Sequence, residues 1–243
     1  MNLESSMEMK FIEALMEEIV VKGRKTPKVQ VERYISPILS MFLKELLNAK
    51  YGKEYKLIMP EFPIRKGTVN RDSEDNSNQS TNIDYLLYNK TDDMFTFVEL
   101  KTDASSYKPS QLEIYQNLDE LCKSYLGDNG NTFGKLLHDD LVKIKEATTY
   151  KHKYKYLLSE WDEKYNAVNK MEIIYLVPKA TKLKDKEDTK QSENKIYIPQ
   201  NNILYFEDLA ENINHEFKEE WKTIIDFMHK LDEKYTFDEA QNK

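Results

Sequence analysis

Residues 94–103 read MFTFVELKTD, and this stretch decides the fold class of the chain. Like the stretch STNIDYLLYN at 80–89, it is rich in the aromatic and β-branched residues that favour β-strands. The residues that lead from one stretch to the other, NKTD at 89–92, are typical of a turn. We therefore predict that the two stretches pair as a β-hairpin.

The chain before this hairpin predicts two helices and a third strand. Apolar residues at helical spacing indicate a short helix over 7–21 and a long one from the Thr26-Pro27 pair to Gly52. Pro37 lies inside the long helix and has no backbone N–H, so we expect a kink or a break there. The stretch KLIMPEFPIR at 56–65 then predicts the strand.

The chain after the hairpin returns to helices and strands. A near-continuous apolar run at 170–178 predicts a strand buried on both faces, and 202–206 predicts a short one. Residues 180–195 are highly charged, which is typical of a solvated loop. Apolar residues at helical spacing predict three further helices, at 106–126, 135–165 and 207–234.

This order of elements indicates an α/β fold with a mixed sheet and helices on its faces. The length of 243 residues fits one domain with insertions. We expect a single domain over 1–243, with a core at about 28–178 and peripheral helices at 1–25 and 207–243.

Composition excludes several classes of protein. Cys122 is the one cysteine, so an internal disulfide is impossible and a reducing compartment is favoured. The net charge is -7. No apolar run approaches the ~18 residues of a membrane span, and the glutamate-rich start is unlike a signal sequence. We therefore expect a cytoplasmic protein that does not enter a membrane. The acidic balance disfavours nucleic-acid binding by bulk charge alone, so any such contact must be local.

An acid and an amine share one face at the end of the 94–103 strand. Glu99 and Lys101 lie two residues apart, so both side chains project to the same side of a strand. Asp84 lies in the preceding strand, and the hairpin can bring its carboxylate beside that of Glu99. Neighbouring carboxylates repel each other, and a hard divalent cation such as Mg²⁺ relieves that repulsion. The pattern therefore predicts a metal site at which Lys101 faces a phosphate or a metal-activated water.

The acid-x-lysine tripeptide recurs freely in this chain, and only its context is specific. Glu99-Leu100-Lys101 follows an apolar strand and, one hairpin earlier, a second acid with apolar flanks. A simpler interpretation is an exposed edge strand on which Lys101 pairs with Asp84 or Glu99, with little effect on stability.

In these residues the chain resembles the PD-(D/E)XK nuclease superfamily. Its common restriction-endonuclease-like core is a helix, a three-stranded antiparallel meander, a helix and a further strand. The resemblance covers about residues 28–178. In it Asp84 is the first acid, Glu99-Leu100-Lys101 is the acid-x-lysine element and Glu32 is the helical glutamate. Ile83 stands where the name of the motif has proline, a residue that many members lack.

The resemblance implies a nuclease that hydrolyses phosphodiester bonds, which we expect to be in DNA, with Mg²⁺ or Mn²⁺ as the cofactor. Asp84, Glu99 and the carbonyl of Leu100 would hold the ion. Glu32 would assist through a water or a second ion. Lys101 would position the attacking water or help to deprotonate it.

Further residues have a functional interpretation and an alternative. Gln111 and Tyr115, in QLEIY, are similar to the Gln-x-x-x-Tyr element of exonuclease-like branches and would contact substrate. Tyr115 also fits the apolar series of its helix, which predicts core packing equally well. Glu32 is an ordinary helix former, and Glu61 in the first strand is its rival as third acid.

The segment LVKIKEATTYKHKYKYLL at 141–158 combines lysines with tyrosines. Lysines can pair with phosphates and exposed bases can stack on tyrosine, so Lys151 and Lys155 are candidate substrate-binding residues. A solvated helix face is the commoner meaning of such a charge run.

Two other functions compete with a nuclease. One is a non-catalytic module that keeps the nuclease fold and binds nucleic acid or protein. The other is an interaction protein, for which the 16 tyrosines would suit an interface. The sequence leaves open whether the substrate is DNA or RNA, whether it is single- or double-stranded, whether it is cut at ends or internally, and whether the chain forms a homodimer.

Overall fold

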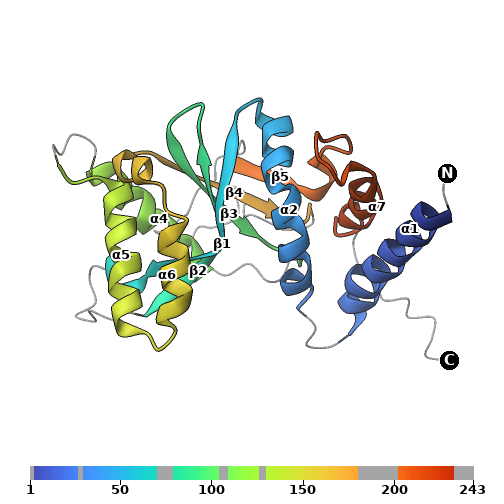
Figure 1. Cartoon of the computed structure of the whole chain (residues 1–243), viewed down its shortest axis with the longest axis horizontal. Helices are drawn as coiled ribbons and strands as arrows, with labels where there is room; N and C mark the ends of the chain where they lie inside the picture. The colour runs from blue at the N-terminus through green and yellow to red at the C-terminus, as the bar shows by residue number, and fades with distance from the viewer. Residues whose placement is uncertain are drawn as a thin grey trace, which may run out of the picture.

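A computed structural model describes residues 3–26, 30–69, 79–103, 109–125, 130–179 and 202–232. At its centre lies a five-stranded sheet in the order β1-β2-β3-β4-β5 (Figure 1). The strands are Tyr55–Arg65 (β1), Ser80–Asn89 (β2), Met94–Leu100 (β3), Met171–Val177 (β4) and Ile203–Tyr205 (β5). The predicted α/β class with a mixed, helix-flanked sheet is confirmed.

The first three strands form an antiparallel meander. β1 pairs with β2, and the pairing of β2 with β3 runs from Asn89 opposite Met94 to Tyr85 opposite Val98. The predicted hairpin is therefore confirmed. β4 pairs with β3 in parallel and β5 pairs with β4 in parallel, so β4 is an interior strand, as its apolar sequence predicted.

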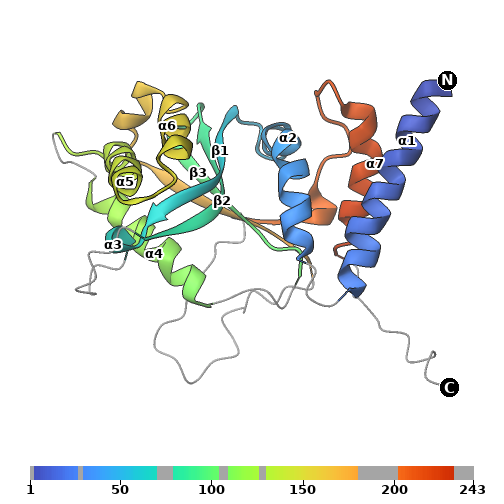
Figure 2. The same ribbon diagram turned by 60° about the horizontal axis from the view of Figure 1, so that its bottom comes forward.

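Helices cover both faces of the sheet (Figure 1 and Figure 2). On one side lie α1 (Leu3–Met16), α2 (Val31–Tyr51) and α7 (Lys218–His229), and on the other α4 (Pro109–Ser124), α5 (Phe133–Ala147) and α6 (Lys151–Ser159). Alternate residues of β3 serve two cores: Val98 and Leu100 pack in the core under α2, and Phe95 and Phe97 in the core under α4 and α5. Glu99 continues the second series, so it leaves the strand on the α4 side.

The segments expected to be peripheral contribute to the core under α2. Met16 at the end of α1 and Trp221 of α7 are both buried in it. Helical backbone follows α1 through a π-helical segment, Glu17–Lys22 (η1), so the predicted helix over 7–21 is present. Among the described residues, no helix combines the length and the apolar character needed to cross a membrane.

Of the kink or break predicted at Pro37, the break does not occur, because α2 runs through the proline as one helix. Proline removes only the bond to the carbonyl of Arg33, and the long buried face of the helix outweighs that loss. The helix ends at Gly52, whose φ of 64° is the left-handed conformation that glycine adopts freely.

The prediction of one helix over 135–165 is wrong. The segment contains α5, α6 and a 3₁₀ turn at Glu163–Ala167. α5 ends where Thr148 becomes extended and its hydroxyl accepts a hydrogen bond from the N–H of Tyr150 over 3.2 Å. Such local side-chain bonds compete with helical ones, and this competition separates α5 from α6.

The last helix is shorter than the predicted 207–234. α7 begins at Lys218, because Phe206, Leu209 and Ile213 enter the core from a 3₁₀ turn and irregular backbone. The loop predicted at 180–195 and the end of the last predicted helix lie outside the described residues.

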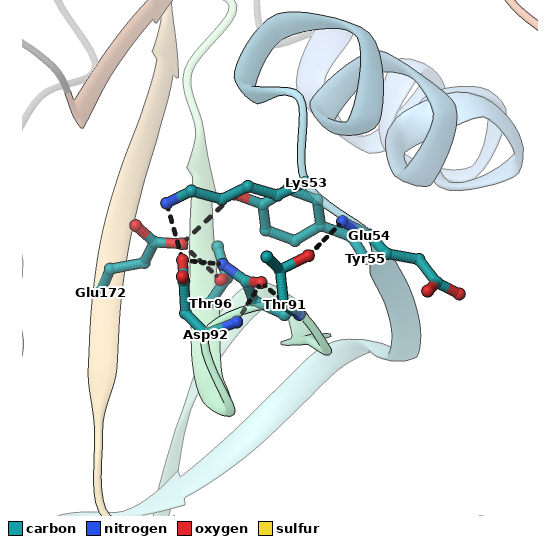
Figure 3. A network of polar contacts seen from close by, with 8 residues as sticks. Lys53, Glu54, Tyr55, Thr91, Asp92, Thr96 and Glu172 are labelled. Atoms are coloured by element: carbon teal, nitrogen blue, oxygen red, sulfur yellow. Dashed lines mark hydrogen bonds and ion pairs between the residues drawn. The ribbon is translucent and has the colours of Figure 1, made fainter.

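A polar network fixes the turn end of the hairpin (Figure 3). Lys53, just before β1, forms an ion pair with Asp92 in the turn, with 2.7 Å between Nζ and Oδ2. The buried Thr96 hydroxyl of β3 donates to Glu172 Oε1 of β4 over 2.7 Å. These contacts hold the register of β1, β2, β3 and β4 at one end of the sheet. The charged residues Glu99 and Lys101 lie at the other end of β3.

Candidate active site

Four elements meet at the end of β3 that lies away from the hairpin turn. β2 contributes Asp84, and β3 contributes Glu99 and leads directly into Lys101. α2 contributes Glu32 from its first turn. α4 lies over the same strand end and supplies two polar side chains. The hairpin brings the first three together, and packing of α2 and α4 on opposite faces adds the others.

Glu99 is a buried carboxylate that accepts hydrogen bonds from three side chains. It is 3% exposed. Its Oε1 lies 2.5 Å from Lys101 Nζ and accepts from Gln111 Nε2 over 2.9 Å. Its Oε2 accepts from the hydroxyl of Tyr115. A buried carboxylate needs such partners, because an unpaired charge in the interior is costly.

The Lys101 ammonium lies among oxygen atoms and is 5% exposed. Besides Glu99, it donates to the carbonyl of Leu100 over 2.9 Å and lies 3.7 Å from Glu32 Oε2. Burial alone would lower the pKa of Lys101, but the carboxylates of Glu99, Glu32 and Asp84 outweigh burial and raise it above its usual value. Lys101 is therefore a charged ammonium at neutral pH.

Asp84 lies one position beyond the last paired residues of β2 and β3. Tyr85 pairs with Val98, which places Asp84 and Glu99 next to each other at the open end of the ladder. Oδ2 of Asp84 accepts a hydrogen bond from the N–H of Leu100 over 2.7 Å. Burial, and then the charge of Glu99, raise the pKa of Asp84 to about 8, although the Leu100 N–H and Lys101 oppose the rise.

Of the two candidates for a third acid, Glu32 reaches the ammonium. Burial raises the pKa of Glu32, Glu99 adds to the rise, and Lys101 opposes it. Glu61 is exposed and accepts instead from Asn82 Nδ2 over 3.3 Å. Glu32, in the first turn of α2, thus lies at the end of β3, and Glu61 lies at the surface.

Gln111 and Tyr115 both hold Glu99. Tyr115 is 3% exposed, and its ring lies edge-on to Tyr175 of β4 with 5.7 Å between centroids. Burial, and then Glu99, raise the pKa of Tyr115 well above its usual value, so its hydroxyl stays protonated and donates. The interpretation of Tyr115 as a core residue is confirmed, and its contact with substrate stays a prediction.

Lys151 and Lys155 lie elsewhere. Both are exposed on α6, which packs on α5 and has no buried residue. Among the described residues, no hydrogen bond or ion pair joins either lysine to Glu99 or Lys101. Tyr150 and Tyr156 beside them are 59% and 64% exposed, so this helix presents lysines and aromatic rings together.

One positioning contact has no signal in the sequence. The buried hydroxyl of Tyr85 donates to the carbonyl of Ser36 over 2.8 Å and lies within hydrogen-bond distance, 2.9 Å, of the Ser36 hydroxyl. This contact fixes the start of α2 on β2 and thereby sets the position of Glu32. Tyr85 and Ser36 are 49 residues apart, and neither belongs to a recognisable motif.

The oxygen donors at this strand end suit a hard cation. Among the described residues, no three His, Cys, Asp and Glu side chains form a group that could hold a metal ion. The predicted set contains two carboxylates, Asp84 and Glu99, and the carbonyl of Leu100. Glu99 Oε1 and the Leu100 carbonyl already converge on one cation, the ammonium of Lys101. These donors are of the kind that Mg²⁺ prefers, and water and substrate phosphate usually complete its coordination.

Comparisons with family models, with curated proteins and with solved structures gave no match.

Proposed function

We propose that the protein is a metal-dependent nuclease of restriction-endonuclease-like fold that hydrolyses phosphodiester bonds in DNA. One observation carries the proposal: Asp84, Glu99 and Lys101 converge at the open end of an antiparallel hairpin. The order of α2, the three-stranded meander, α4 and the parallel strand β4 supports it further. A simple edge-strand ion pair fits less well, because Glu99 and Lys101 are buried on an interior strand.

Each side chain has a separate part in this proposal. Asp84, Glu99 and the Leu100 carbonyl would hold Mg²⁺ or Mn²⁺, which supplies Lewis-acid stabilisation of the phosphate and lowers the pKa of a bound water. Lys101 would bring a positive charge beside the metal, where it can orient the attacking water and stabilise charge on the phosphate oxygens. Gln111 and Tyr115 keep Glu99 in one orientation.

Features outside the site are compatible with DNA and with a reducing compartment. The exposed lysines and tyrosines of α6 offer phosphate contacts and stacking surfaces away from the reacting groups. The lone Cys122 is buried, and its thiol donates to the carbonyl of Asn169 over 3.3 Å. A single buried thiol supports a reducing compartment such as the cytoplasm.

The proposal is tested by incubating the protein with supercoiled plasmid, linear duplex and single-stranded DNA, with Mg²⁺, with Mn²⁺ and with excess chelator. We expect cleavage that requires the metal and that Glu99→Gln abolishes. Glu163→Gln, at an exposed position on the 3₁₀ turn, controls for the loss of one negative charge. Cleavage in chelator, or full activity of Glu99→Gln, would contradict a metal-dependent mechanism. A folded protein that binds DNA without cleaving it under any condition would favour the non-catalytic module.

A further inference from the structure

The Lys101 ammonium contacts two of the three oxygen donors assigned to the metal, Glu99 and the carbonyl of Leu100. Its Nζ lies 2.5 Å from Glu99 Oε1, 2.9 Å from the Leu100 carbonyl and 3.7 Å from Glu32 Oε2. The other oxygen of Glu99 accepts from the Tyr115 hydroxyl. Both oxygens of Glu99 are therefore occupied by donors.

An ammonium and a metal ion would compete for these oxygens. Mg²⁺ requires its ligands at about 2.0–2.1 Å in near-octahedral geometry, so an ion that binds both Glu99 Oε1 and the Leu100 carbonyl would lie close to the present position of the ammonium. Two cations in contact within a buried site would also repel strongly. This repulsion favours displacement of the Lys101 side chain when Glu99 and the Leu100 carbonyl serve as ligands.

We propose that Lys101 is a built-in counter-ion that fills the cation position of the metal-free protein and leaves it when the metal binds. This inference rests on the proposed function. The lysine stem is a flexible four-carbon chain, which allows such a movement without a change in the backbone. The exchange keeps the buried Glu99 paired in both states, with an ammonium in one and a divalent ion in the other.

Glu32 marks the direction in which the ammonium leaves. It is the third oxygen partner of Lys101 and its side chain is 31% exposed, whereas that of Glu99 is 4% exposed. A lysine that gives up Glu99 and keeps Glu32 moves outward, towards solvent. Glu32 is thus a positioning residue for the displaced lysine.

The first test compares metal binding by calorimetric titration, with no substrate present. Lys101→Met keeps much of the length of the stem and removes the competing charge. We expect its Mg²⁺ affinity to rise by about tenfold or more over the unchanged protein, within the usual range of coupling between two bound groups. Lys170→Met is the matched control, because Lys170 is exposed and lies beside the opposite end of β3, where its carbonyl accepts from Phe95.

The second test observes the unchanged protein and does not depend on a variant that folds. In protein labelled with ¹⁵N-lysine, the ordered ammonium of Lys101 should give a protected ¹H–¹⁵N signal, assigned by its absence from Lys101→Met or, if that variant is unfolded, from Lys101→Arg. Saturating Mg²⁺ should shift or remove this signal, and NaCl of the same ionic strength should not.

The outcomes separate this inference from the proposed function. If Mg²⁺ binds and the Lys101 signal is unchanged, or if Lys101→Met binds Mg²⁺ no more tightly than Lys170→Met, the exchange is refuted while the nuclease proposal stands. If neither Mg²⁺ nor Mn²⁺ binds to any of these proteins, both proposals fail.

Discussion

The N–H of Leu100 donates to Oδ2 of Asp84 over 2.7 Å, at the point where backbone pairing between β2 and β3 has ended at Tyr85 and Val98. The side chain thus takes the place of a backbone carbonyl and ties the two strands together one residue further along. The same bond fixes the carboxylate of Asp84 beside Glu99. The carboxylate of Asp84 is therefore both a structural contact between the strands and a proposed metal ligand.

Two substitutions of Asp84 should separate these roles. Asp84→Asn keeps an oxygen that can accept from Leu100 and removes the charge, so we expect a folded protein whose cleavage rate falls by at least about 100-fold. Asp84→Ala also removes the acceptor and should lower the free energy of unfolding by about 1–3 kcal/mol. Cleavage assays and urea unfolding measure the two effects. Equal stability of the two variants would show that the Leu100 bond contributes nothing.

Removal of the Tyr115 hydroxyl should weaken the site without disturbing the core. Tyr115→Phe keeps the ring against Tyr175 and deletes one of the three donors to Glu99. We therefore expect the free energy of unfolding to fall by about 1.5–3 kcal/mol, which is typical of hydrogen bonds to charged groups. The control is Tyr165→Phe, because the Tyr165 hydroxyl is buried without a hydrogen-bond partner among the described residues. Chemical denaturation should show that Tyr165→Phe is neutral or stabilising. A similar loss in both variants would argue against a special role for Tyr115.

Glu32 and Glu61 should differ in their effect on activity. Glu32→Gln changes a partner of Lys101, and we expect cleavage to fall by about 10- to 100-fold, as for residues that position metal ligands. Glu61→Gln removes the same charge at an exposed position that contacts Asn82, and it should leave the rate within experimental error. The ratio of the two initial rates on one DNA substrate decides between them. A larger effect at Glu61 would make it the third acid.

Asp140 should make stability depend on pH. Its carboxylate is buried on α5, 3.8 Å from Lys143 Nζ, and burial raises its pKa although Thr68, Lys143 and Arg65 oppose the rise. Because the folded-state pKa lies above the ordinary value, the folded protein binds the proton more tightly than the unfolded chain does. The contribution of Asp140 is therefore most favourable below the ordinary pKa of an aspartate and declines as the pH rises through the folded-state value.

Asp140→Asn should consequently be more stable than the unchanged protein at pH 7, on the order of 1 kcal/mol for each unit of pKa shift. The difference should shrink as the pH falls towards 4. Asp139→Asn, at the exposed neighbouring position, should show no such trend. Thermal melting at several pH values gives the comparison, and a stability difference that grows on acidification would contradict the assigned direction of the pKa shift.

The lysines of α6 should contribute to DNA affinity and not to the chemical step. Replacing Lys151 and Lys155 with glutamine should reduce the slope of log affinity against log salt by about 0.9 for each lost contact with duplex phosphate, that is by about 2. The cleavage rate at saturating DNA should stay the same. Fluorescence anisotropy in chelator measures the binding, with Lys222→Gln on α7 as the charge control. An unchanged slope would remove α6 from the binding surface.

Several features of this protein were predictable because they depend on near neighbours in sequence. The aromatic and β-branched stretches that form β1, β2 and β3, the turn that joins β2 to β3, and the left-handed end of α2 at Gly52 all follow from local preferences. The two-residue period of a strand also places Glu99 and Lys101 on one side of β3. Helix bounds were less predictable, because Thr148 ends α5 through its own side chain and the buried Phe206–Ile213 segment delays α7.

Only the tertiary structure decided which partners these charges have. The sequence contained Glu32 and Glu61 as equal candidates, and the anchoring of Ser36 by Tyr85 turned one of them towards Lys101. It contained Tyr115 as a core or a substrate-contacting residue, and the packing of α4 on β3 and β4 buried it with its hydroxyl on Glu99. Residue type and spacing set the strand and its two charges, since those depend on the chain's own period. Burial of an ammonium between Glu99 and the Leu100 carbonyl depends on segments far apart in sequence, and their contact exists only once α2, α4 and the sheet have packed together.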